Sequence, residues 1–90
     1  MRILKAKVYG KVQGVWFRKC TYNFAKGIGL VGMVKNLRDG TVLVNASGAD
    51  KSLEEFKEYL DKGSPNSRVD KIVFTWEHSL IEYSKFEIEY

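Results

Sequence analysis

Hydrophobic and polar residues alternate in three stretches of the chain, which is the pattern of half-buried β-strands. In residues 3–9, Leu4, Ala6 and Val8 share one parity and two lysines take the other. The same alternation recurs in residues 69–77 and 86–90. Because successive side chains of a strand point to opposite faces, each stretch is predicted to be a strand with one buried face. The aromatic residues of the last two stretches are expected mainly to pack on the sheet.

Two other stretches carry hydrophobic residues at helical spacing. In the first, side chains three and four positions apart form one stripe: Phe17, Cys20, Thr21, Phe24, Ala25 and Ile28. This spacing predicts an amphipathic helix, with Gly29 as the left-handed residue that ends it. A second helix is predicted over residues 51–62, with Asp50 as its N-cap and Gly63 just past its end.

A hairpin is predicted between the two helices. Residues 30–37 and 41–47 are rich in β-formers and are joined by Arg38, Asp39 and Gly40. An Asp-Gly pair favours a tight turn because both residues tolerate positive φ. Asn36 shares the parity of Val34, so it is expected at the end of the first hairpin strand on the side of a core valine.

The predicted elements follow the order β-α-β-β-α-β, with a further short strand at the C-terminal end. Right-handed crossovers then give an α+β fold of the ferredoxin-like split βαβ type, in which two helices cover one face of a mostly antiparallel sheet. A length of 90 residues fits a single domain over residues 1–90.

Composition narrows the classes of protein that fit. Hydrophobic residues make up 44% of the chain and charged residues 29%, which is typical of a globular domain. No apolar run approaches the ~20 residues that span a bilayer, and charges interrupt the N-terminal segment, so a cytoplasmic protein is expected. The net charge of +4 fits an anionic partner, but solvated surface lysines explain it equally well.

The sequence contains one cysteine, Cys20, and one histidine, His78. A single cysteine excludes an internal disulfide, and the spacing of the two residues matches no zinc-ligand pattern. No metal site and no cofactor are therefore expected. Cys20 lies on the helical stripe and is predicted to be a buried structural thiol, whereas His78 is expected in a solvated polar loop.

The segment Gly10-Lys11-Val12-Gln13-Gly14-Val15-Trp16-Phe17-Arg18 joins the first predicted strand to the first helix. Glycines allow such a loop to turn successive backbone N–H groups inward, and the helix N-terminus adds unpaired donors. Arg18 in the first helical turn can bind a tetrahedral dianion with two N–H groups. The segment therefore suggests a phosphate-binding loop. The alternative from these residues alone is a glycine-containing connector with an exposed arginine.

The same segment resembles the signature loop of the acylphosphatase family. The similarity continues in order along the chain, through Ile28-Gly29-Leu30, Asn36, Asp39-Gly40 and residues 63–70, to the closing Phe86, Ile88 and Tyr90. It implies hydrolysis of the carboxyl–phosphate bond of an acyl phosphate, without a metal. By this resemblance Arg18 and Asn36 are the essential residues, Arg18 binding the phosphate and Asn36 placing the attacking water.

The phosphate-binding loop implied by the resemblance contributes backbone N–H groups, from Gln13, Gly14, Val15, Trp16, Phe17 and Arg18. Trp16 lies at a position where the family varies. Met33 and Ile28 depart from the commoner pattern, where an aromatic residue and a leucine are frequent. None of the three coincides with Arg18 or Asn36, so they bear on the rim of the site and on substrate preference.

The resemblance also implies the partners: a small-molecule acyl phosphate, and inorganic phosphate as product and inhibitor, with no nucleic acid or membrane and a monomeric state. Two other functions remain to be separated from it. A ferredoxin-like RNA-binding module would carry base-stacking aromatics on its third strand, but residues 41–47 contain none. An accessory domain that binds phosphate without turnover would differ only in activity.

Overall fold

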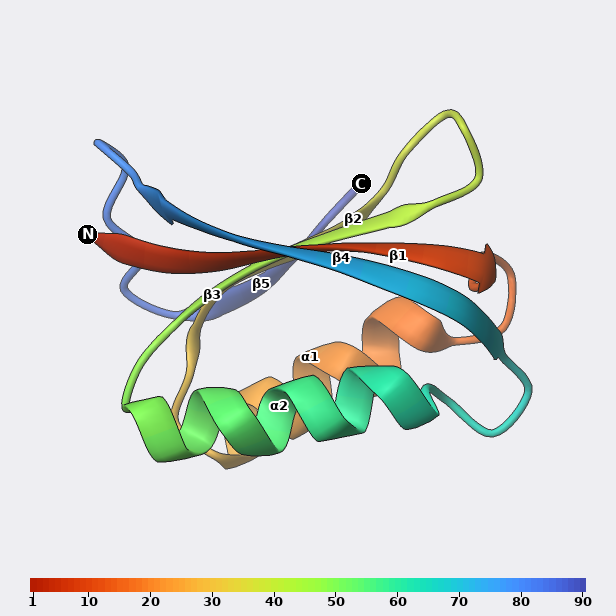
Figure 1. Cartoon of the computed structure of the whole chain (residues 1–90), viewed down its shortest axis with the longest axis horizontal. Helices are drawn as coiled ribbons and strands as arrows, with labels where there is room; N and C mark the ends of the chain where they lie inside the picture. Colours follow the sequence, from red (N-terminus) through yellow and green to blue (C-terminus); the bar gives the residue numbers. More distant parts are fainter.

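A computed structural model describes residues 1–90 and contains the predicted elements in the predicted order. They are β1 (Arg2–Lys11), α1 (Phe17–Gly27), β2 (Val31–Asn36), β3 (Val42–Ser47), α2 (Asp50–Lys62), β4 (Arg68–His78) and β5 (Phe86–Glu89). The strands form one sheet in the order β4-β1-β3-β2-β5, and both helices cover the same face of it (Figure 1). All strand pairs are antiparallel except the parallel pair β2–β5. The ferredoxin-like α+β fold is thus confirmed. No helix has the length and apolar character needed to cross a bilayer.

The alternation of β1 sets the core. Leu4, Ala6 and Val8 are at most 1% exposed, and they pair with Ala46, Val44 and Val42 of β3. These aliphatic side chains face the two helices, and each helix buries one stripe of its own residues against them. The buried helical residues are Phe17, Thr21 and Ala25 of α1 and Leu53, Phe56 and Leu60 of α2. The face of the sheet that packs against the helices is therefore the one that the sequence pattern predicts to be buried.

The helix ends agree with prediction at two of the three positions that the sequence singled out. Gly29 has φ +78° and donates to Lys26 O, while Leu30 donates to Ala25 O, which is a Schellman motif. Gly63 follows α2 with φ +73°. The predicted N-cap of α2 is wrong: Ala49 occupies that position with extended dihedral angles, and Asp50 is already in the first turn. An acidic side chain there still favours the positive end of the helix dipole.

The β2–β3 hairpin forms, but its turn differs in detail from the prediction. Gly40 has φ +90°, whereas Asp39 does not enter the left-handed region. Leu37 N–H donates to Thr41 O at 2.9 Å, and Gly40 N–H donates back to Leu37 O at 3.2 Å. This is a three-residue loop in which glycine alone supplies the left-handed residue. The turn begins directly after Asn36 and therefore holds that residue at the end of β2.

Strands β1 and β4 are longer than predicted, whereas β5 ends one residue earlier, at Glu89. β1 continues to Lys11 because Gly10, at φ +135°, sits in a β-bulge against β4, where a Cβ atom would lie 2.0 Å from Arg68 O. β4 extends to His78, which pairs with Arg2 and is exposed. The placement of His78 in a polar loop is therefore wrong, although its exposure is as expected.

Candidate active site

The β1–α1 connection has an unusual backbone. Gly14 has φ +73° and Trp16 has φ +64°, and Trp16 is the only non-glycine residue of the chain with positive φ. Val15 between them has negative φ, so the sign of φ alternates along these three residues. Such alternation turns neighbouring N–H groups to one side and makes an anion-binding concavity. None of the backbone N–H groups from Gln13 to Lys19 donates to another backbone oxygen.

Side chains on both sides hold this loop in place. Val12 and Val15 are buried in the core cluster. The hydroxyl of Ser64, in the α2–β4 connection, donates to Val15 O at 3.1 Å. From the other side, Gln13 Nε2 donates to Leu37 O at 2.7 Å and to Thr41 O at 2.9 Å. The loop is therefore tied to two separate parts of the fold, one of which is the hairpin that follows Asn36.

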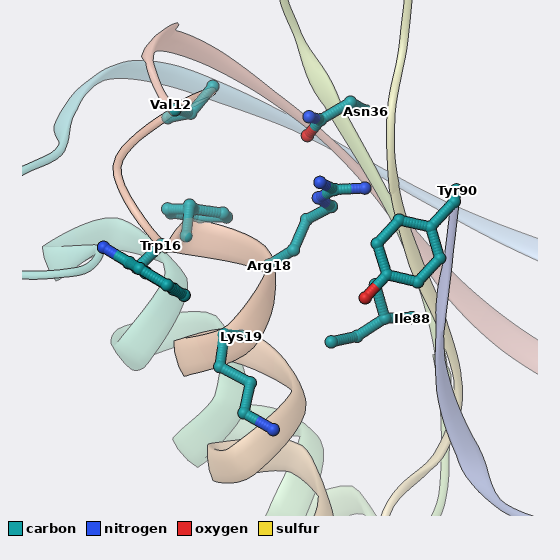
Figure 2. Close-up of a pocket in the computed structure, with 9 residues that line it drawn as sticks. Val12, Trp16, Arg18, Lys19, Asn36, Ile88 and Tyr90 are labelled. Carbon is teal, nitrogen blue, oxygen red and sulfur yellow. The ribbon is translucent and has the colours of Figure 1, made fainter.

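Arg18 extends from the first turn of α1 toward Asn36 (Figure 2). Its Nη1 donates to Glu89 O at 3.3 Å, and its guanidinium carbon lies 4.9 Å from the ring centroid of Tyr90. A guanidinium has five N–H donors, so one bond to a carbonyl leaves most of them available. The first turn of α1 and the C-terminal end of β5 thus together fix the position of this cation.

Asn36 is the last residue of β2. Its Oδ1 is buried and has no hydrogen-bond partner. A buried acceptor without a partner is costly, and it is satisfied when a water or ligand donor binds beside it. The Asn36 side chain points toward the guanidinium of Arg18 (Figure 2).

Arg18 and Asn36 line one pocket of about 430 Å³, within the usual range for small-molecule sites. The residues that line it are Val12, Gly14, Trp16, Phe17, Arg18, Lys19, Asn36, Ile88 and Tyr90. Among them Arg18 and Lys19 are the charged side chains, and both are cationic. The pocket therefore combines positive charge with an apolar wall, and none of the lining side chains is a carboxylate or an imidazole.

The structure brings together most of the residues that the sequence singled out. Gly14, Trp16, Phe17 and Arg18 of the predicted loop line the pocket with Asn36, whereas Val15 is turned into the core. Four lining residues were not predicted as site residues: Val12, Lys19, Ile88 and Tyr90. Tyr90, expected to pack on the sheet, is 98% exposed. Parallel pairing of β5 with β2 brings Ile88 and Tyr90 to the pocket, and the sequence holds no signal for that pairing.

Asp39 lies close to Asn36 in the sequence, but its carboxylate interacts with other groups of the turn and of β1. The Thr41 hydroxyl, the Thr41 backbone N–H and the Lys7 ammonium together lower the pKa of Asp39 to about 2. Lys7 Nζ lies 3.0 Å from Asp39 Oδ2. The carboxylate is therefore ionised at neutral pH and structural, in keeping with the interpretation of Asp39 and Gly40 as turn residues.

Cys20 is only partly buried, so its prediction as a buried thiol is wrong. Phe17, Thr21 and Ala25 take the centre of the stripe, four residues apart, and leave Cys20 at its edge. No group of three or more His, Cys, Asp or Glu side chains is arranged to hold a metal ion.

Comparisons with known proteins agree with this fold. The family model for acylphosphatase matches residues 4–88. Acylphosphatase-2 of Cavia porcellus is 46% identical over 87 residues, which cover 93% of this chain and 88% of that protein. The Homo sapiens acylphosphatase-2 is 44% identical over the same shares. A crystal structure of acylphosphatase from Bacillus subtilis superposes with a TM-score of 0.93 at 39% identity, covering both chains completely. The chain therefore belongs to the acylphosphatase family, and it is an acylphosphatase, a hydrolase of small-molecule acyl phosphates.

Proposed function

We propose that this enzyme hydrolyses acyl phosphates without a metal ion, with Arg18 and the backbone N–H groups of residues 13–18 binding the phosphate and Asn36 positioning the water. One observation carries the proposal. Arg18 and Asn36, from different elements, line one pocket together with a loop whose N–H groups have no backbone partner. An arginine and a set of amide donors can carry the charge of a phosphoryl group in transfer.

The reaction itself needs little from the protein. Water attacks phosphorus, the bond between phosphorus and the acyl oxygen breaks, and its electron pair leaves on the carboxylate. The conjugate acid of that leaving group has a pKa near ~4–5, so no general acid is required. Positioning and charge stabilisation then account for most of the rate enhancement.

The attacking water must be held in line with the bond that breaks. In the proposed arrangement, Asn36 Oδ1 accepts a hydrogen bond from this water, which satisfies the one buried acceptor of the site that has no partner. No lining side chain is a suitable base. The proton of the water therefore passes to an oxygen of the substrate's own phosphate.

The position of the acyl group follows from the position of the phosphate. The phosphate occupies the polar part of the pocket, next to Arg18 and the loop, so the acyl group lies along the apolar part. That wall comprises Trp16, Ile88 and Tyr90. Trp16 is 75% exposed, so its indole is available to a ligand.

Turnover of benzoyl phosphate tests the proposal and also separates an enzyme from a phosphate-binding accessory domain. The loss of benzoyl phosphate absorbance is followed with purified protein, with EDTA and with added magnesium. We expect hydrolysis at the same rate in all three conditions. Strict dependence on added magnesium would remove the metal-free mechanism, and no turnover at all would leave only a binding function.

A further inference from the structure

The side chain of Gln13 joins the loop to the hairpin that carries Asn36. Its Nε2 donates both protons, to Leu37 O at 2.7 Å and to Thr41 O at 2.9 Å. These two oxygens lie at the two ends of the hairpin turn, and each already accepts a backbone hydrogen bond across it. Gln13 therefore spans the mouth of the turn and uses both of its amide protons there.

The position of this contact matters because of what lies on either side. Gln13 begins the stretch of free backbone N–H groups, and Leu37 follows Asn36 directly. No other side-chain hydrogen bond links residues 12–18 to the β2–β3 hairpin; the Ser64 bond holds the loop from the α2–β4 side. The distance between the loop and the Asn36 amide is thus set, on the hairpin side, by Gln13.

We propose that Gln13 is a positioning residue, whose side chain fixes where the water on Asn36 stands relative to the phosphate in the loop. This inference rests on the proposed function. Gln13 is not among the residues that line the pocket, so its side chain acts through Asn36 and does not itself contact the substrate. A misplacement of about 1 Å at a reacting atom can cost on the order of 10²-fold in rate.

A double-mutant cycle between Gln13 and Asn36 tests this directly. Gln13→Met keeps the length and removes both donors. We expect kcat to fall about 10- to 100-fold, with KM and the inhibition constant of inorganic phosphate changed less than about threefold. In the Asn36→Ala background, the same change should lower kcat by less than about threefold, because there is no longer a water to misplace.

Ser64→Ala is the matched control, because it removes a hydrogen bond to the same loop from the opposite side. Whatever factor it costs in the wild type, it should cost again in the Asn36→Ala background. Melting temperatures of all variants are measured in parallel, and the Gln13 effect on melting should be the same in both backgrounds. Gln13→Asn keeps the amide but is too short to reach both oxygens, so it repeats the cycle if Gln13→Met does not fold.

Equal losses of kcat for Gln13→Met in the two backgrounds would overturn the inference and make Gln13 a purely structural residue. A rise in the phosphate inhibition constant that matches the fall in kcat would do so too, because the loop itself would then be damaged. Neither result touches the proposed function, which fails separately if Asn36→Ala alone retains its kcat.

Discussion

The guanidinium of Arg18 lies against the ring of Tyr90, with 4.9 Å between the guanidinium carbon and the ring centroid. A cation over an aromatic face is attracted to it, and the hydrogen bond to Glu89 O adds a second restraint. Both contacts orient the long side chain, which would reduce the rotamer entropy lost on binding phosphate in the proposed mechanism. Strand β5 therefore supports the site as well as the sheet.

Asn36→Ala should lower kcat by ~10²–10³, as expected for the loss of one preorganised polar group in a transition state. KM should change little, because in the proposed mechanism Asn36 holds the water and not the substrate. Steady-state kinetics with benzoyl phosphate measures both. Asn45→Ala is the control, since Asn45 Oδ1 is also buried without a partner but lies outside the pocket. Near-normal kcat in Asn36→Ala would mean that another group holds the water.

Trp16→Ala should weaken the binding of aromatic acyl phosphates selectively. An aromatic contact contributes about 0.5–1.5 kcal/mol, so KM for benzoyl phosphate should rise about 2- to 10-fold. KM for acetyl phosphate, whose acyl group is one methyl, should rise less than about twofold. Trp76→Ala, at an exposed tryptophan that does not line the pocket, is the control. Equal changes for the two substrates would show that the acyl group does not contact Trp16.

Most of the fold could be predicted because local patterns and burial coincide. Leu4, Ala6 and Val8 alternate in sequence and face the helices in the structure. The N-cap of α2 could not be predicted in the same way. Asp50 is a good capping residue, but Ala49 already has the extended dihedral angles of the cap, and the Asp50 carboxylate lies 3.5 Å from Arg2 instead.

The features of the site also divide into those that the sequence predicts and those that it does not. Arg18 and Asn36 follow from a family resemblance, and the glycines predict a loop. The backbone of Trp16 does not follow, because no sequence signal marks a bulky residue as left-handed. The two hydrogen bonds of Gln13 and the approach of Tyr90 also depend on contacts between residues distant in the chain, which periodicity does not report.

Cys20→Ser should retain kcat within about twofold. The thiol lies at the edge of the α1 stripe, is partly exposed and does not line the pocket. A change at such a position usually costs less than about 1 kcal/mol in unfolding free energy. Chemical denaturation and benzoyl phosphate turnover test the two statements. Complete loss of turnover in a variant that is folded by circular dichroism would make Cys20 a catalytic residue.

Tyr59 should make the protein less stable at alkaline pH. Burial, assisted by the nearby Cys20, raises the pKa of Tyr59 from about 10 to about 12. The folded state therefore keeps the phenol proton longer than the unfolded chain does. Its contribution to stability is complete below pH 10 and is lost as the pH rises toward 12.

Tyr59→Phe should therefore show a smaller fall in unfolding free energy between pH 10 and 12 than the wild type. At pH 7 the variant should be about as stable, because the buried Tyr59 hydroxyl has no hydrogen-bond partner to leave behind. Urea denaturation at a series of pH values gives both results. Parallel curves for the two proteins across the alkaline range would contradict the role given to Tyr59.

The most direct test of the site is the melting temperature with inorganic phosphate, in the wild type and in Arg18→Ala. Phosphate held by the folded loop stabilises the native state by RT ln(1 + [L]/Kd), about 1.4 kcal/mol at ten times Kd. For a domain of this size, that predicts a rise of roughly 5–10 °C. Sulfate should raise the melting temperature in the same way, whereas chloride at equal ionic strength should not. Phosphate should also inhibit turnover competitively. Arg18→Ala should abolish the rise in melting temperature, whereas Lys26→Ala, which removes an exposed cation from the same helix outside the pocket, should preserve it. A phosphate shift that survives intact in Arg18→Ala would place the anion elsewhere and contradict the assignment of Arg18.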